Sequence, residues 1–337
     1  MTAISRRRAL KTLFCSSAAL GLNLSSRPAA ADGINSPFDQ HFMIVGDFGS
    51  MDKSQSAVSA GMIRYAQTHS LKPQGLWLLG DNFYKELKGG VDSPRWKTGF
   101  DAMYPANSFP GPCWAMLGNH DYHDTIDGEL AQLAYAEKHL TTRWKMPAKW
   151  YRVDWPQVKP VVTFLVVDTN WKNINEQLHK KSIGKRKPWW ISEDEEKAQD
   201  AWLKAELAKP RTAPFLFVTG HHPFYTNGPH GDTKPLLEKW GKLLQENGVH
   251  LYLCGHDHDL QHLELEGLKT SFVVSGAGGA RLTEIKNKQR TTPFAKAVYG
   301  FSHLQIDSKR FLMRHMDANG QQLHAFSKTT GGNVTIL

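Results

Sequence analysis

The chain has 337 residues, of which 40% are hydrophobic, so it is long enough to bury a sizeable core and too apolar for a disordered protein. Its formal net charge is +9, but five basic residues and no acidic residue precede Asp32. Removing residues 1–31 leaves 36 basic and 32 acidic residues, and this net charge of +4 suits anionic substrates without demanding nucleic acid as a partner.

Residues 1–31 are predicted to be a signal peptide. The basic segment Ser5–Lys11 precedes a modestly apolar stretch at 13–24, and Ala29–Ala31 offers the small residues of a cleavage site. The paired arginines favour the twin-arginine type, with an ordinary Sec signal as the alternative. We therefore expect a periplasmic or secreted protein. No later apolar run is long enough for a membrane span.

The first half of the mature chain alternates strands and helices. Residues 41–45 predict a buried strand, and 54–69 an amphipathic helix with Ser54 as a possible N-cap. Strands at 75–79 and 112–117 follow, separated by a polar segment that is mostly loop. Strand–helix–strand repeats of this length indicate parallel pairing with right-handed crossovers.

The second half continues the α/β pattern. The expected elements are a helix at 128–140, antiparallel strands at 149–155 and 161–167, a capped helix at 192–208, a strand at 215–218, a helix at 234–247, and strands at 249–254, 271–275, 299–306 and 311–315. Residues 317–337 are expected to be a loosely attached C-terminal tail.

Residues 171–191 form a conspicuous insertion that is both basic and rich in tryptophan. A nucleic-acid role is one interpretation, because such segments can stack on bases. A solvated surface loop is the plainer interpretation, since charge runs are usually solvated. A third is a flap that attracts phosphate esters. We expect no nucleic-acid partner.

Five short polar stretches, each after an apolar run, carry the chemistry. They are Gly46–Gly49, Gly80–Tyr84, Gly118–Asp121, Val218–His221 and Gly255–His258. In open α/β sheets, ligands bind where the strands end. The carboxylate of Asp81 can bridge two cations, and the phenolate of Tyr84 favours ferric iron. The pattern predicts a dinuclear metal site assembled from strand ends.

At these residues the chain resembles the purple acid phosphatases, a family of binuclear metallophosphoesterases, and most closely their small tartrate-resistant branch. The five stretches match the family motifs GDxG, GDxxY, GNH[DE], VxxH and GHxH in order, within a resemblance that spans about residues 41–315. The resemblance implies an α/β fold, a four-layer α/β/β/α sandwich with two mixed β-sheets, forming one catalytic domain over residues 32–316.

The resemblance also implies the metals and their ligands. A ferric ion and a divalent ion (iron, zinc or manganese) would share Asp81 as a bridge. The ferric ion would take Asp47, Tyr84 and His258, and the divalent ion Asn119, His221 and His256.

Two further histidines would be catalytic without being ligands. These are His120 in the third motif and His230, nine residues after His221. We assign no role to His222, where relatives often have an aromatic residue. The acidic residues Asp121, Asp257 and Asp259 are expected to stabilise turns or to orient the ligand imidazoles.

The implied activity is hydrolysis of phosphate monoesters at acidic pH by attack of a metal-bound hydroxide. Substrates would be small phosphate esters or phosphoproteins, and the protein is expected to be a monomer. One alternative is a phosphodiesterase or nucleotide pyrophosphatase on the same scaffold. Another is a non-catalytic module that binds polyanions through the basic insertion.

Overall fold

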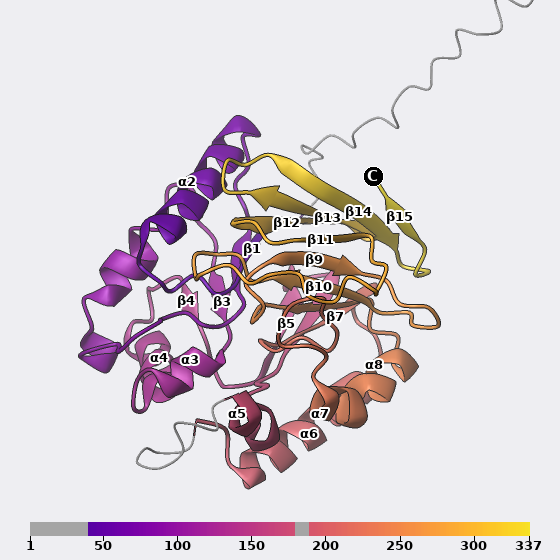
Figure 1. The fold of residues 1–337 in the computed structure, drawn as a ribbon, viewed down its shortest axis with the longest axis horizontal. Coiled ribbons are helices and arrows are strands. Elements are labelled where there is room, and N and C mark those ends of the chain that lie inside the picture. Colours follow the sequence, from indigo (N-terminus) through magenta and orange to yellow (C-terminus); the bar gives the residue numbers. More distant parts are fainter. Residues whose placement is uncertain (1–39, 179–188) are drawn as a thin grey trace, which may run out of the picture. The chain divides into compact units, whose positions relative to one another are not determined.

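The structure is a computed structural model, which describes residues 40–178 and 189–337 (Figure 1). The predicted signal peptide lies outside these residues, and so do the lysines and the arginine at 180–187 of the insertion. Among the described residues, no helix combines the length and apolarity that a membrane crossing requires.

The first sheet has eight strands and is mixed, with β1, β2, β3 and β4 parallel to one another and the remaining strands antiparallel. Its strands in spatial order are β15 (Val334–Ile336), β14 (Gln322–Thr329), β13 (Arg310–Asp317), β12 (Gly300–Ile306), β1 (Gln40–Val45), β2 (Gly75–Leu78), β3 (Cys113–Ala115) and β4 (Trp144–Lys145).

The second sheet has seven strands and is also mixed, with β6, β7, β8 and β10 parallel in its centre. Its strands in spatial order are β11 (Phe294–Lys296), β9 (Leu260–Leu263), β10 (Ser271–Ser275), β8 (Leu251–Cys254), β7 (Phe215–Thr219), β6 (Val162–Val166) and β5 (Tyr151–Trp155). The predicted antiparallel pair at 149–155 and 161–167 is confirmed as β5 and β6.

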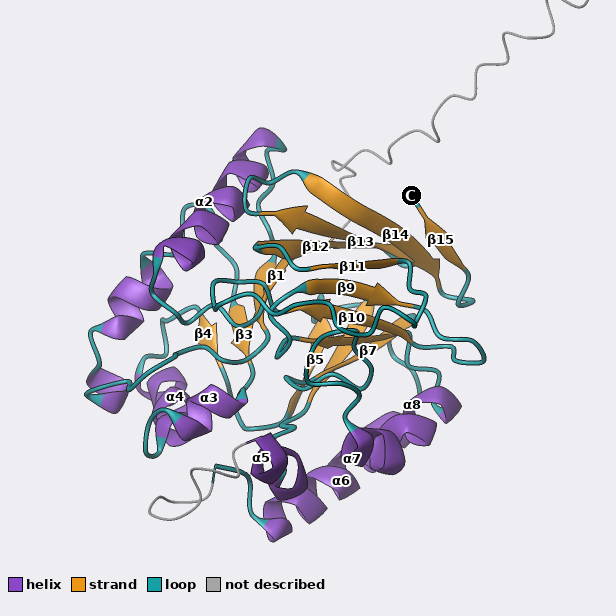
Figure 2. Cartoon of the chain, viewed as in Figure 1, coloured by secondary structure: helices purple, strands orange, loops and turns teal. Residues whose placement is uncertain are grey.

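Helices cover the outer faces of both sheets (Figure 2). On the side of the first sheet these are α2 (Lys53–Thr68), α3 (Asn119–His123) and α4 (Gly128–Lys138). On the side of the second sheet they are α5 (Lys172–Leu178), α6 (Glu193–Ala208), α7 (Lys234–Leu236) and α8 (Lys242–Glu246). The predicted sandwich with two mixed sheets is therefore confirmed.

The hydrophobic core lies between the two sheets. Strands β1 and β2 are buried on both faces. Phe42 and Ile44 of β1 and Trp77 of β2 join the inter-sheet core, where Phe164 and Phe217 of the second sheet meet them. Strands buried on both faces are typical of parallel sheets under helices, which is why they read as continuous apolar runs.

Two expectations about local structure were wrong. The N-cap of α2 is Asp52, whose carboxylate accepts hydrogen bonds from the backbone N–H groups of Ser54 and Gln55. Residues 317–337 are not a loose tail, because β14 pairs with β13 over most of its length and β15 pairs with β14. The ammonium of Lys328 in β14 is buried and bonds to the carbonyl oxygen of His250.

The tryptophans of the insertion serve the fold. Trp171 is buried against Trp240, with ring centroids 4.6 Å apart, and the ammonium of Lys239 lies 4.8 Å from its centroid. Trp189 is buried too, with its ring 4.3 Å from that of His123. These two rings are therefore not exposed platforms on which nucleic-acid bases could stack.

Candidate metal centre

Five of the predicted ligands follow strands at one edge of the two sheets. Asp47, Asp81 and Asn119 come two to four residues after β1, β2 and β3, which are parallel neighbours in the first sheet. His221 and His256 come two residues after β7 and β8, which are parallel neighbours in the second. The site therefore lies where the carboxyl ends of both sheets meet.

One group of donor atoms centres on the hydroxyl of Tyr84. Its oxygen lies 3.1 Å from Oδ2 of Asp81, 3.3 Å from Oδ1 of Asp47 and 3.1 Å from Nε2 of His258. The same His258 nitrogen is 3.5 Å from Oδ1 of Asp47. Four predicted ligands thus bring one donor atom each to a single point.

A second group centres on the amide oxygen of Asn119. This Oδ1 is 3.1 Å from Nε2 of His221 and 3.0 Å from Nδ1 of His256, and the two nitrogens are 3.3 Å apart. Nε2 of His221 also lies 3.5 Å from Oδ2 of Asp81. Asp81 consequently stands between the two groups, and the structure brings all seven predicted ligands together.

Three of the predicted ligands have unusual backbone conformations. Asp47, Asp81 and His256 have φ angles of 56°, 52° and 71°, in the left-handed region that non-glycine residues rarely occupy. Such conformations persist at functional sites because the surrounding structure enforces them. Two glycines make room for the carboxylates, since a Cβ on Gly118 or Gly255 would lie 2.2–2.3 Å from an oxygen of Asp81 or Asp47.

Hydrogen bonds outside the centre fix the ligand orientations. Oδ2 of Asp47 accepts from the backbone N–H of His256 at 2.9 Å. The Nδ1 atoms of His221 and His258 donate to the carbonyl oxygens of Leu79 and Arg281, at 2.8 Å and 2.6 Å. Each ring is thereby left with Nε2 facing the other donors.

The electrostatics of the buried donors favour cations. Burial raises the pKa of Asp47, and burial followed by the carboxylates of Asp81 and Asp47 raises the pKa of the Tyr84 phenol well above its ordinary value. Burial opposes the charged form of His221, yet Asp81 and Asp47 raise its pKa to about 10. Without a metal ion, the raised pKa values favour the protonated forms of Asp47, Tyr84 and His221. Metal cations bound to these side chains would take the place of the protons. Three acidic groups, one amide oxygen and three imidazoles therefore fit a pair of hard or borderline metal ions.

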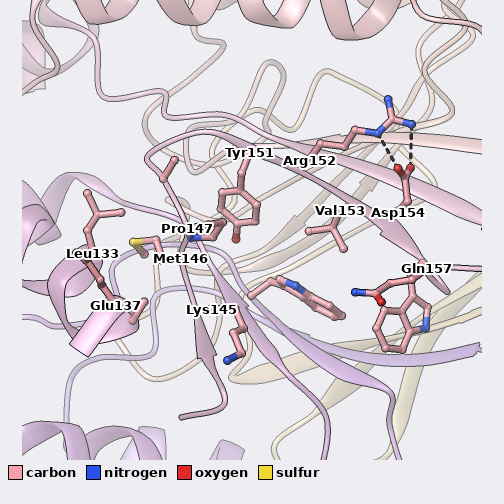
Figure 3. Close-up of a pocket in the computed structure, with 14 residues that line it drawn as sticks. Leu133, Glu137, Lys145, Met146, Pro147, Tyr151, Arg152, Val153, Asp154 and Gln157 are labelled. Atoms are coloured by element: carbon pink, nitrogen blue, oxygen red, sulfur yellow. Dashed lines mark hydrogen bonds and ion pairs between the residues drawn. The ribbon is translucent and has the colours of Figure 1, made fainter. Parts of the chain in front are cut away.

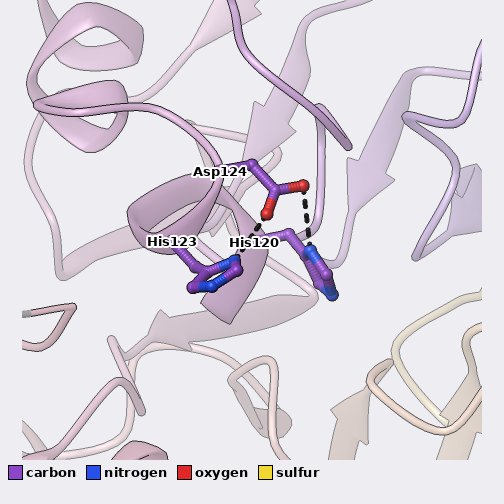
Figure 4. A group of neighbouring side chains, drawn as sticks. All are labelled: His120, His123 and Asp124. Atoms are coloured by element: carbon purple, nitrogen blue, oxygen red, sulfur yellow. Dashed lines mark hydrogen bonds and ion pairs between the residues drawn. The ribbon is translucent and has the colours of Figure 1, made fainter. Parts of the chain in front are cut away.

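His120 lies beside the first donor group. Its ring is 4.5 Å from that of Tyr84, and its backbone N–H donates to Oδ1 of Asp81 at 2.8 Å. Its Nδ1 donates to Oδ2 of Asp124 at 3.0 Å, and Nδ1 of His123 lies 2.6 Å from the other oxygen of the same carboxylate (Figure 4).

His230 lies beside the second donor group. Its ring is 4.2 Å from that of His256, and its Nδ1 is 2.6 Å from Oδ1 of Asp257. Thr226 donates its hydroxyl to the other oxygen of Asp257. Both predicted catalytic histidines therefore border the centre from opposite donor groups, and a carboxylate holds each.

The structure shows what the three acidic residues near the site contact. Asp257 orients His230, which is not a predicted ligand. Asp121 accepts hydrogen bonds from the backbone N–H groups of Gly118 and Asn82, at 2.8 Å and 3.0 Å, and so ties two ligand-bearing turns together. Asp259 accepts from the side chain of Gln261 at 2.8 Å. Asp121 therefore stabilises turns, which was one of the expected roles, whereas the imidazole that Asp257 orients is that of His230 and not that of a predicted ligand.

Sequence reasoning missed two residues. His222 is buried, with its Nδ1 2.8 Å from Oγ1 of Thr169 and its ring 4.4 Å from that of His256. Asp124 gave no motif of its own. Its place four residues after His120 was the available signal, because residues with that spacing share a helix face.

A pocket of about 460 Å³ adjoins the second donor group. His222, His230 and His256 line it, together with residues 173–174, residues 231–235 and Glu238. A larger pocket, of about 930 Å³, lies where β4 and β5 edge the two sheets, and Lys145 and Tyr151 are among its lining residues (Figure 3). None of the predicted site residues lines the larger pocket.

Comparisons with known proteins agree with this geometry. The family model for the calcineurin-like phosphoesterases matches residues 41–260. The chain is 30% identical over 300 residues to tartrate-resistant acid phosphatase type 5 of Oryctolagus cuniculus, covering 84% of this chain and 88% of that protein. It is 32% identical over 258 residues to purple acid phosphatase 17 of Arabidopsis thaliana, covering 74% and 70%.

Solved structures share the fold. A purple acid phosphatase from yellow lupin seeds superposes with a TM-score of 0.62 at 18% identity, covering 88% of this chain and 54% of that one. GAP50, described as the anchor in the inner membrane complex of Plasmodium, superposes with a TM-score of 0.70 at 19% identity, covering 86% and 88%. The chain belongs to the calcineurin-like phosphoesterase family, among relatives of the purple and tartrate-resistant acid phosphatases, and is a hydrolase of phosphoric esters.

Proposed function

We propose that this protein hydrolyses phosphate monoesters at a centre of one ferric and one divalent ion. The main support for this proposal is that seven donor atoms converge into two groups that share Asp81. Tyr84, Asp47 and His258 would hold the ferric ion, and Asn119, His221 and His256 the divalent one. When bound, the ions supply Lewis acidity to the ester oxygens and lower the pKa of a water molecule that attacks phosphorus.

The chain's own residues supply the remaining steps. His120 and His230 border the two donor groups, where imidazolium N–H groups can donate to the equatorial phosphoryl oxygens. When the bond between phosphorus and the leaving oxygen breaks, the alkoxide needs a proton. His230 is placed to provide it, because it lines both the centre and the 460 Å³ pocket. Asp257 holds its ring for that transfer through Nδ1.

The pocket favours small esters as substrates. A volume of about 460 Å³ lies in the range of small-molecule sites and would hold the alcohol part of a phosphate ester. A phosphorylated side chain of a protein could also enter, since the pocket opens beside exposed residues such as Lys234 and Glu238. We further propose that the protein acts as a monomer after export to the periplasm or the cell exterior.

Turnover by metal-loaded protein tests this function. We expect 4-nitrophenyl phosphate to be hydrolysed at acidic pH with kcat/KM at least tenfold above that for bis(4-nitrophenyl) phosphate. A preference for the diester would move the assignment to a phosphodiesterase. Phosphate binding without turnover of either ester would indicate a non-catalytic binding module and contradict the proposal.

A further inference from the structure

The carboxylate of Asp124 contacts three residues from two segments of the chain beside the centre. Its Oδ2 accepts from the backbone N–H of Lys85 at 2.6 Å and from Nδ1 of His120 at 3.0 Å. Its Oδ1 is 2.6 Å from Nδ1 of His123. Lys85 directly follows Tyr84, so one side chain, 14% exposed, connects the turn that carries the phenol with the helix that carries His120.

These contacts describe a hydrogen-bonded unit, although two histidines and an aspartate also resemble a metal-binding set. The histidine nitrogens that face the carboxylate are both Nδ1 atoms, and each already has its own oxygen of Asp124 at hydrogen-bond distance. One of those oxygens also serves the N–H of Lys85. The atoms therefore satisfy one another without an added ion.

The hydrogen bond from His120 to Asp124 determines which ring nitrogen of His120 carries a proton. An ionised carboxylate only accepts hydrogen bonds, so Nδ1 of His120 carries a proton and Nε2 points away from Asp124 (Figure 4). The main chain of His120 is fixed separately, through its N–H bond to Asp81. Hydrogen bonds thus fix the backbone of His120 and the Nδ1 atom of its ring. Only Nε2 is left to contact a substrate.

We propose that Asp124 is the positioning residue of His120, fixing its tautomer and ring orientation for contact with the phosphoryl group. Asp257 does the same for His230, at 2.6 Å. Asp124 follows β3 of the first sheet and Asp257 follows β8 of the second. Each histidine is therefore oriented independently of the other. This inference rests on the proposed function only for the expected effect on kcat. The tautomer and orientation of the His120 ring do not depend on that function.

A double-mutant cycle tests it kinetically. The variants are Asp124→Ala, Asp124→Asn, His120→Asn and the combination Asp124→Ala with His120→Asn, all loaded with metal. Glu86→Gln is the matched control, since it removes one negative charge from the exposed part of the same turn. Partners that orient metal-ligating imidazoles typically contribute about 10–100-fold, and we expect Asp124→Ala to lower kcat by a similar factor with KM changed by less than about twofold.

The cycle separates positioning from general stability. In the His120→Asn background, Asp124→Ala should have almost no further effect, because there is no imidazole left to position. Asp124→Asn should lose no more than about threefold in kcat, since its amide oxygen can still accept from His120 and Lys85. If Asp124→Ala lowers activity equally with and without His120, the residue acts independently of the imidazole and the proposal is wrong.

A spectroscopic measurement needs no activity. Long-range ¹H–¹⁵N NMR of zinc-loaded, histidine-labelled protein reports which ring nitrogen bears the proton, and His120→Asn identifies the signal. At alkaline pH, where the ring carries a single proton, we expect that proton on Nδ1 in the wild type and in Asp124→Asn, and a tautomer mixture in Asp124→Ala. An unchanged His120 signal in Asp124→Ala would overturn the proposal. A wild type with the expected tautomer but no turnover would instead refute the proposed function.

Discussion

Nδ1 of His230 lies 2.6 Å from Oδ1 of Asp257, and the other oxygen of this carboxylate accepts from Thr226. Gly228 packs directly on the carboxylate, since a Cβ there would lie 2.3 Å from Oδ2. A hydrogen bond to a packed carboxylate therefore orients the imidazole between the candidate metal centre and the pocket. A group so placed suits proton transfer to a leaving alcohol, because transfer requires fixed geometry.

His230→Ala should consequently lower kcat most for esters with poor leaving groups. Removal of a positioned acid typically costs about 10²–10⁴-fold, and a nitrophenolate needs the proton far less than an alkoxide does. The measurement compares 4-nitrophenyl phosphate with glycerol phosphate, with His139→Ala as a control outside the site. Equal losses on both esters would deny His230 the acid role.

Asp81→Asn should abolish the pairing of metals. Its Oδ2 lies within 3.5 Å of donor atoms from both groups, and a neutral amide is a poor bridge between two cations. We expect fewer than two metal ions per chain by elemental analysis and loss of most of the activity. Asp92→Asn, which changes an exposed aspartate paired with Lys138, is the control. Retention of two metals and full turnover by Asp81→Asn would refute the bridge.

Gly118→Ala should weaken the centre through steric conflict. The added Cβ would lie 2.2 Å from Oδ1 of Asp81 and 2.3 Å from its backbone nitrogen, so the two turns must separate. We expect at least tenfold weaker metal binding, measured by competition with a chelator. Gly241→Ala, where a Cβ meets nothing within 4 Å, should leave metal affinity unchanged. Equal affinities in the two variants would show that the close approach is unimportant.

The buried histidines should make the fold less stable as the pH falls below about 6.5. Burial lowers the pKa of His303 and His315 well below the ordinary value, and burial followed by His262 lowers that of His324 to about 4. These histidines stay neutral in the folded chain while the unfolded chain binds protons, so acid favours unfolding down to about pH 4. Each contributes up to about 1.4 kcal/mol per pH unit.

Urea unfolding of the protein between pH 7.5 and 4.5 measures this slope. His324→Gln should reduce it by up to the contribution of one site, whereas Lys97→Gln, an exposed change, should not alter it. A slope that is the same in His324→Gln and in the wild type would contradict the neutral state of this buried histidine.

The sequence predicted the parts of the fold whose patterns are local. Phe42, Ile44 and Trp77 lie in continuous apolar runs, so β1 and β2 were recognised, and the capping box of Ser192 and Glu195 correctly placed the start of α6. β14 escaped recognition because its inward-facing residues include His324 and Lys328, which are buried through hydrogen bonds that only the folded chain provides.

The sequence predicted the ligands that directly follow apolar strands. It did not predict the residues that orient the two histidines beside them. Asp47 and Asp81 follow apolar runs beside glycines, which marks them in the sequence. The role of Asp124 depends on Lys85 lying 39 positions earlier in the chain and on the direction of the ring of His120, which no local pattern encodes. For the same reason the sequence did not reveal that the partner of Asp257 is His230.

The visible absorption spectrum of the purified, oxidised protein tests the central claim most directly. If Tyr84 binds ferric iron, its phenolate must produce a charge-transfer band that colours the protein purple. We predict that this band is present in the wild type and absent from Tyr84→Phe. A colourless wild type that contains two metal ions per chain would contradict the ferric assignment and leave Tyr84 as a structural residue.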